Sequence, residues 1–222
     1  MALDTYTALQ TAVASWLHRD DVSTSIPDFI ALAEEAMSRD LADLPVMWAT
    51  ATVSVTAGQN SLSLPADAMG LVYAKVLGSY QQQIPFVSIE SLIRTTSPVV
   101  ATGRPQAIAF RGNTGADGKA SAIVYPTADA AYDFEIGYRA AVPALSSGNP
   151  TNFILKRAPS IYLYGALIAS APFVVQDDRL PMWEAKYRQA VDAFKSQEWD
   201  GVQMLSTEIS GIGRVPFDIT TG

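Results

Sequence analysis

Two neighbouring stretches decide the fold class, because residues 132–140, YDFEIGYRA, and residues 161–169, IYLYGALIA, follow different hydrophobic periods. In the first stretch apolar and polar residues alternate, so its large apolar side chains share one face and predict a half-buried β-strand. The second stretch is apolar nearly all round, which is typical of a helix at the centre of a bundle. The change of period predicts a chain that combines a β region with packed helices.

Helical spacing also occurs at both ends of the chain. Apolar stripes that include Trp16 and Leu32 predict two short helices before Pro45. We expect Pro172 to end the central apolar helix and Pro181 to lie in the first turn of a final one, where proline is tolerated. Helices this short do not close a core alone, so we expect the two ends of the chain to form one bundle of about four helices.

The segment between these helices has about six or seven β-like runs separated by turn signals, which is typical of a sandwich or small barrel. The predicted fold class is therefore α+β, a helical bundle from both termini with an inserted antiparallel β-sandwich or small barrel. The predicted parts are the first half of the bundle in residues 1–47, the β domain in 48–149, the second half of the bundle in 150–200 and an extended C-terminal tail in 201–222.

The composition combines many apolar residues with few charges. Of 222 residues, 49% are hydrophobic and 17% are charged, against roughly 25% charged in typical soluble domains. Either part of the surface is buried against other subunits, or the chain is a well-packed monomer with a polar uncharged coat. The net charge of −7 has the wrong sign for gripping nucleic acid phosphates, although an acidic protein can still let DNA pass.

The residues that usually carry chemistry are scarce. The chain has no cysteine, which excludes disulfides and thiolate metal sites, and its single histidine, His18, is expected to be solvated at a helix end. Residues 112–121, GNTGADGKAS, only partly match a phosphate-binding loop, because Asn113 replaces the first glycine and Ala120 replaces the magnesium-binding hydroxyl. We interpret this stretch as a polar hairpin loop.

One pair of carboxylates shares a face of the predicted strand. Asp133 and Glu135 lie two positions apart, opposite Phe134. Paired carboxylates perform acid–base catalysis only inside a cleft that separates their pKa values, and nothing in the sequence places a cleft there. We therefore expect no catalytic activity, no cofactor and no metal site, while a hydrolase that uses these two carboxylates stays as an alternative.

Several segments together resemble the head-to-tail adaptor (connector) proteins of tailed phages. The resemblance covers roughly residues 4–195, is strongest from Tyr132 onward, and lies in the following stretches: LQTAVASWLHRDD (9–21), IPDFIALAEEAMSRDL (26–41), SLSLPADAMGL (61–71), GRP (103–105) and residues 131–191. Its most specific part runs from NPTNF (149–153) through LYGAL (163–167) and APF (171–173) to Trp183 and Tyr187. None of these motifs is catalytic.

The resemblance implies a structural role in the virion, at the junction of head and tail, for a protein made in the host cytoplasm. Such adaptors form a ring, usually of twelve subunits, beneath the portal protein. The ring extends the channel through which double-stranded DNA passes without specific binding, and it offers a docking platform for the nozzle or tube proteins of the tail. The helices pack around the ring, and the β insertion faces the tail.

The resemblance also assigns candidate contact residues. The C-terminal segment is expected to reach the portal, here as an extended segment and not as a long helix, through Met204, Leu205, Ile209, Ile212, Arg214, Val215 and Phe217. The hairpin loop is expected to contact tail proteins through Asn113, Asp117 and Lys119. The alternative from another class is a carbohydrate- or surface-binding virion module that stacks its ligand on Tyr132 and Tyr138.

Overall fold

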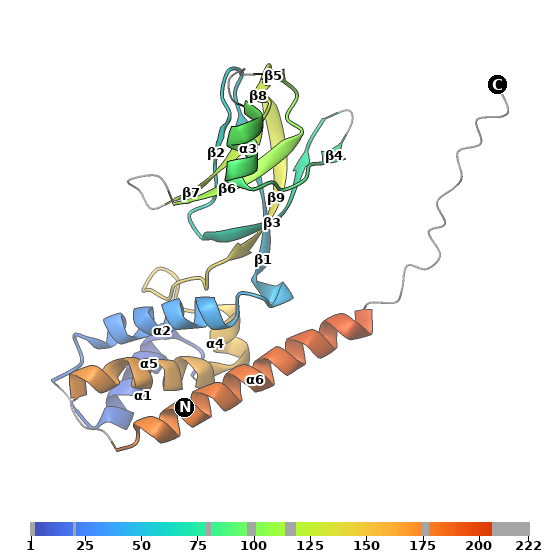
Figure 1. Cartoon of the computed structure of the whole chain (residues 1–222). Helices are drawn as coiled ribbons and strands as arrows, with labels where there is room; N and C mark the ends of the chain where they lie inside the picture. Colours follow the sequence, from blue (N-terminus) through green and yellow to red (C-terminus); the bar gives the residue numbers. More distant parts are fainter. Residues whose placement is uncertain are drawn as a thin grey trace.

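The computed structural model describes residues 3–19, 21–78, 81–96, 101–113, 119–174 and 178–205. It contains helices and largely antiparallel sheets, so the predicted α+β class is confirmed. Two separate hydrophobic clusters divide the described residues. We call the part around the first cluster the helical module and the part around the second the β module, and Figure 1 shows them joined through β1 and the chain that follows β9.

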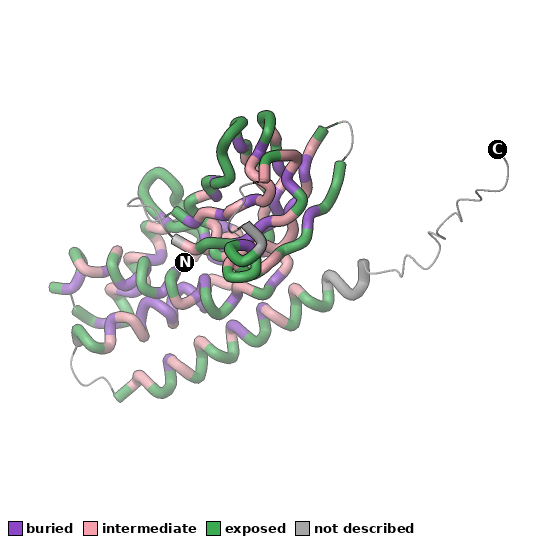
Figure 2. The backbone as a smooth tube through the Cα atoms, turned by 45° about the horizontal axis from the view of Figure 1, so that its top comes forward, coloured by how far each residue is buried: buried purple, intermediate pink, exposed green. Residues whose placement is uncertain are grey.

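The helical module is built around one apolar helix. Its elements are α1 (Tyr6–Leu17), α2 (Ile26–Asp40), α4 (Phe153–Arg157), α5 (Pro159–Val174) and α6 (Leu180–Leu205). Ile161, Tyr162, Ala166 and Leu167 on α5 are fully buried, which confirms its predicted central place. Figure 2 shows that α6, in contrast, is mainly exposed or half-buried along its described length. The bundle thus encloses α5, and α6 packs on it from outside.

Two predicted helix ends are wrong. Pro172 lies inside α5, which continues to Val174, so the proline lies in the last turn of the helix and does not end it. Helix α6 continues to Leu205, so residues 201–205, expected at the start of an extended tail, belong to the helix. An ion pair between Arg157 and Glu198, with 2.6 Å between Nη2 and Oε1, ties this part of α6 to α4.

The β module consists of small sheets that close around the second cluster. The four-stranded sheet has the order β1 (Trp48–Val55), β9 (Tyr132–Ala140), β3 (Ala68–Val76) and β4 (Gln82–Gln83). The three-stranded sheet has the order β2 (Ser61–Ser63), β7 (Ala120–Tyr125) and β6 (Ala107–Asn113), and both sheets are antiparallel. The remaining elements are η1 (Pro45–Met47), α3 (Ile89–Thr96) and the parallel pair β5 (Thr102–Gly103) and β8 (Thr127–Ala128).

Strand β9 is the centre of the β module and shows the predicted alternation. Phe134 and Ile136 are fully buried and Tyr138 is nearly so, whereas Asp133 is exposed on the opposite face. On this opposite face the backbone of Gly137 lies against the aromatic ring of Tyr73. A Cβ atom at this glycine would lie 2.2 Å from Cε1 of Tyr73 on β3. The Tyr73 ring therefore occupies the place of a side chain at position 137.

A buried polar cluster holds the segment between β9 and α4 to the bundle. Glu34 of α2 is 7% exposed and its Oε1 accepts hydrogen bonds from the Leu145 backbone N–H, at 2.7 Å, and from the Tyr162 hydroxyl, at 3.1 Å. Ser38, one turn later, accepts from the Val142 N–H at 3.0 Å. The side chain of Asn152 caps α4 by accepting from the Leu155 N–H. The Tyr162 hydroxyl and the backbone N–H groups of Val142, Leu145 and Leu155 thus all have hydrogen-bond acceptors.

Substitution Gly137→Ala should destabilise the protein by about 1–3 kcal/mol, because the added methyl group displaces the Tyr73 ring and breaks its hydrogen bond to Glu135. The control is Gly70→Ala on β3, where an added Cβ has no neighbour within 4 Å, and the expected change there is below about 0.5 kcal/mol. Urea denaturation measures both. Equal effects of the two substitutions would contradict the close approach.

Substitution Glu34→Gln should alter the pH dependence of stability. Burial raises the pKa of Glu34 above its ordinary value of 4.5, so the folded state binds the proton more tightly than the unfolded state. The free energy of unfolding of the wild type should therefore contain a component that falls as the pH rises from 4.5 through the higher folded pKa. The Glu34→Gln chain should lack this component, and Glu35→Gln, an exposed neighbour, should keep it. Parallel pH profiles for all three chains would contradict this role of Glu34.

Candidate functional site

The two carboxylates considered for hydrolysis are bound to neighbouring strands. The Ser54 hydroxyl donates to Oδ1 of Asp133 at 2.6 Å, and the Tyr73 hydroxyl donates to Oε1 of Glu135 at 3.1 Å. Lys75 Nζ lies 3.9 Å from the same Glu135 oxygen. Both groups lie on the outer face of the sheet, each against a side chain of an adjacent strand. These contacts give the carboxylates a cross-strand structural role.

The two tyrosines considered for ligand stacking are also engaged. Tyr138 is 6% exposed within the core of the β module, and its hydroxyl donates to Oδ1 of Asp67 at 3.3 Å. Tyr132 donates to Oδ1 of Asp129 at 2.8 Å. Since the ring of Tyr138 is buried, it offers no face to a sugar. Of the two tyrosines on which the carbohydrate-binding alternative depends, Tyr138 is therefore not accessible to a ligand.

The remaining chemical candidates are isolated. His18 is exposed and ends α1 in a left-handed conformation with φ of 52°. Among the described residues, no group of three or more histidine, cysteine, aspartate or glutamate side chains is arranged to hold a metal ion. In the same part of the chain, no helix combines the length and the apolar character needed to cross a membrane.

The predicted contact residues are only partly described. Residues 112–121 connect β6 to β7 as a hairpin, so the stretch runs from strand to strand and not from strand to helix as a phosphate-binding loop does. Asn113 ends β6 and Lys119 is exposed just before β7, while Asp117 lies outside the described residues. Met204 and Leu205 lie in the last turn of α6. Ile209, Ile212, Arg214, Val215 and Phe217 lie outside the described residues.

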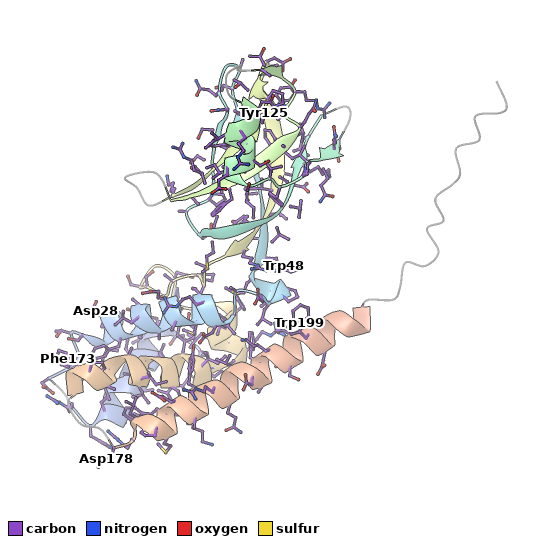
Figure 3. All side chains as sticks on the ribbon, in the orientation of Figure 1. Asp28, Trp48, Tyr125, Phe173, Asp178 and Trp199 are labelled. Atoms are coloured by element: carbon purple, nitrogen blue, oxygen red, sulfur yellow. The ribbon has the colours of Figure 1, made fainter. Side chains whose placement is uncertain are left out.

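Large apolar side chains are exposed at several places that the sequence pattern did not single out. Trp16 and Leu32, expected in buried stripes, are 40% and 53% exposed. Leu32 and Phe173 lie on α2 and α5, and Trp48 and Trp199 lie on β1 and α6. Figure 3 shows Phe173 at one end of the helical module, and Trp48 and Trp199 toward the other end and the junction. Exposed large apolar side chains thus occur on several elements, with Phe173 and Trp199 on different parts of the helical module.

A groove lies between α2, α5 and α6. Its volume is about 450 Å³, and Asp40, Gly165, Tyr187 and Val191 are among its lining residues. Gly165 lets the helices come close, since a Cβ there would lie 3.1 Å from Cβ of Ala33. The Tyr187 hydroxyl donates to Oδ2 of Asp40 at 2.8 Å, and burial together with this hydrogen bond raises the pKa of Tyr187. The phenol thus stays neutral and acts as a clamp between α6 and α2.

Comparison with known proteins identifies the family of the chain. No curated protein matches the sequence. The profile of the SU10 adaptor protein family matches residues 4–209, which is nearly the whole chain and includes all the elements described above. The chain therefore belongs to the SU10 adaptor protein family, a family of phage head-to-tail adaptors.

Proposed function

We propose that the protein forms a ring, of twelve subunits, beneath the portal of a tailed phage, where it extends the DNA channel and docks the tail. The family match over residues 4–209 carries this proposal. The match also supports a location in the virion, at the junction of head and tail. The adaptor has a structural role, without catalytic activity or a cofactor, in keeping with the cross-strand roles of Asp133 and Glu135.

The exposed apolar areas support a ring. Phe173 on α5 is 52% exposed and Trp199 on α6 is 41% exposed, and the two lie at different places on the helical module. A contact between two different surfaces of identical subunits is heterologous, and it closes into a ring when the rotation allows. We infer that the Phe173 area of one subunit packs against the Trp199 area of the next.

The negative net charge of the subunit supports a role in which DNA passes through the ring. With a net charge of −7, the subunit lacks the excess of Lys and Arg that releases counterions from DNA and provides affinity for its phosphates. A channel built from such subunits repels the duplex weakly and does not retain it. Double-stranded DNA would therefore pass without specific binding.

We assign the contact with the portal protein to the C-terminal end of the chain. Helix α6 has 26 residues, a length of about 39 Å, and Figure 1 shows it leading away from the bundle toward its C-terminal end. Met204 and Leu205 end this helix, and the apolar residues Ile209, Ile212, Val215 and Phe217 follow, with Arg214 among them. Nozzle or tube proteins of the tail would meet the β module, including the hairpin residues Asn113, Asp117 and Lys119.

Deletion of residues 206–222 should abolish binding of the portal protein and leave the fold intact. All buried core residues of the described chain lie at or before Phe194, so the thermal midpoint should shift by no more than a few degrees, while binding to purified portal falls at least tenfold. A chain with Val215→Ser and Phe217→Ser should reproduce the loss, and the matched control with Thr220→Ser and Thr221→Ser should bind normally. Full binding by the truncated chain would refute the assignment.

A further inference from the structure

The two segments that join the modules each pass from one core to the other between adjacent residues. On the segment that leaves the helical module, Met47 is 2% exposed and belongs to the helical core. The next residue, Trp48, begins β1 and pairs with Arg139 of β9. Its N–H donates to the backbone carbonyl of Pro45 and so ends the short helix η1. The first boundary between the modules therefore lies at the peptide bond between Met47 and Trp48.

The returning segment changes module just as abruptly. The Ala141 N–H donates to the backbone carbonyl of Asp67, in the β module, at 2.8 Å. The following N–H, of Val142, donates to Oγ of Ser38 on α2 at 3.0 Å, and the side chain of Val142 is buried in the helical core. The second boundary therefore lies at the peptide bond between Ala141 and Val142.

The two boundaries lie next to each other. Because Trp48 is opposite Arg139 in the antiparallel pair of β1 and β9, the two connecting segments leave the sheet side by side, and Figure 1 shows both where the modules meet. Neighbouring strands are about 5 Å apart. A line through both boundaries is thus an axis about which the β module can tilt without breaking a strand pair or a helix.

The hydrophobic cores on the two sides of this axis do not merge. The buried apolar residues of the described chain form two clusters, one in each module, and no residue belongs to both. Parts of a chain move relative to one another unless a large hydrophobic interface holds them together. Within the described residues, no buried apolar cluster spans the junction and fixes the angle between the modules.

A cleft takes the place of such packing. It has a volume of about 210 Å³, and its lining includes Val46 and Phe153 from the helical module and Ala49 and Asp67 from the β module. Val46 and Phe153 pack against the helical core, and Ala49 packs against the core of the β module. Surfaces separated by a cleft lack the dispersion contacts that hold close-packed surfaces in one arrangement. The cleft therefore leaves space for a change of angle.

An ion pair bridges the junction at the surface. Nη2 of Arg139, on β9, lies 3.1 Å from Oδ1 of Asp43, which follows α2. The two side chains are 46% and 81% exposed. Exposed ion pairs stabilise a structure little, because water and salt screen them. The pair can therefore restrain a tilt of the β module without preventing it.

We propose that the junction is a hinge, in which the β module tilts as a rigid body about the axis through the two boundaries and the Asp43–Arg139 pair restrains the tilt. The helical side of the hinge is fixed, since Ser38 and Glu34 of α2 hold the returning segment. The inference follows from contacts within one chain. In the ring proposed above, a tilt would let the β modules adjust to a docking tail, and this consequence alone rests on the proposed function.

Distances between two spin labels test the hinge, because the chain has no cysteine and two introduced cysteines are then its only labelled sites. Ala31→Cys on α2 and Thr52→Cys on β1 place one label at an exposed position of each module. The control pair, Ala31→Cys and Ala193→Cys, lies within the helical module. Double electron–electron resonance on the full-length chain, diluted with unlabelled chain, gives the distribution of each distance, and thermal midpoints show that each variant folds.

We expect the distance distribution between the modules to be at least about twice as wide as the distribution within the helical module, because only the former includes the tilt. Asp43→Asn should widen the distribution between the modules further, since it removes the ion pair. The matched control is Asp28→Asn, the same change at an exposed carboxylate that Figure 3 shows at the end of the helical module away from Trp48. This control should leave the distribution unchanged.

Equally narrow distributions for the two label pairs, with and without Asp43→Asn, would overturn the hinge. Equal widths in the Asp43→Asn and Asp28→Asn chains would overturn the role of the ion pair as its restraint. Salt tests this role independently, because a salt concentration of about 1 M shortens the Debye length to about 3 Å. It should widen the distribution of the chain with the ion pair and leave that of Asp43→Asn unchanged. None of these measurements needs portal or tail, so their failure would leave the adaptor function standing.

Discussion

The buried carboxylate of Glu34 is the constraint on which the rest of the structure depends. It lies on α2, accepts from the Leu145 N–H and the Tyr162 hydroxyl, and so joins three segments that are far apart in the sequence. Burial of a carboxylate costs free energy unless donors surround it, and here the donors come from α5 and from the segment that leaves β9. Because this segment is bound to α2, the β module is carried at a defined place above the bundle.

The consequence is a protein of two cores with different tasks. A helical core closes around α5 and a second core closes around β9, and an ion pair between Asp43 and Arg139, at 3.1 Å, adds a contact at their junction. Apolar side chains such as Phe173 and Trp199 remain exposed on the helical module. Each module therefore has a hydrophobic core of its own, and large apolar side chains remain exposed outside both cores.

Much of this architecture could be predicted from the sequence, because the alternation in residues 132–140 and the apolar run in residues 161–169 reflect burial directly. Three features could not. Pro172 was expected to end α5, but α5 is the buried central helix, and tertiary packing overrides local helix propensity. Helix α6 continues to Leu205, and the Arg157–Glu198 pair that joins it to α4 is a tertiary contact that the sequence pattern does not reveal. Leu32 follows the helical period yet is exposed, since the pattern alone does not distinguish a core stripe from a contact surface.

The central claim is that the protein lies where head meets tail, and its position in the virion tests this most directly. An antibody raised against the chain should be applied, with gold labelling, to intact virions and to heads from which the tails have been removed. Label at the single vertex of head and tail, stronger after the tails are removed, is the predicted result. Label on fibres or on the capsid faces, or no label on either particle, would contradict the account.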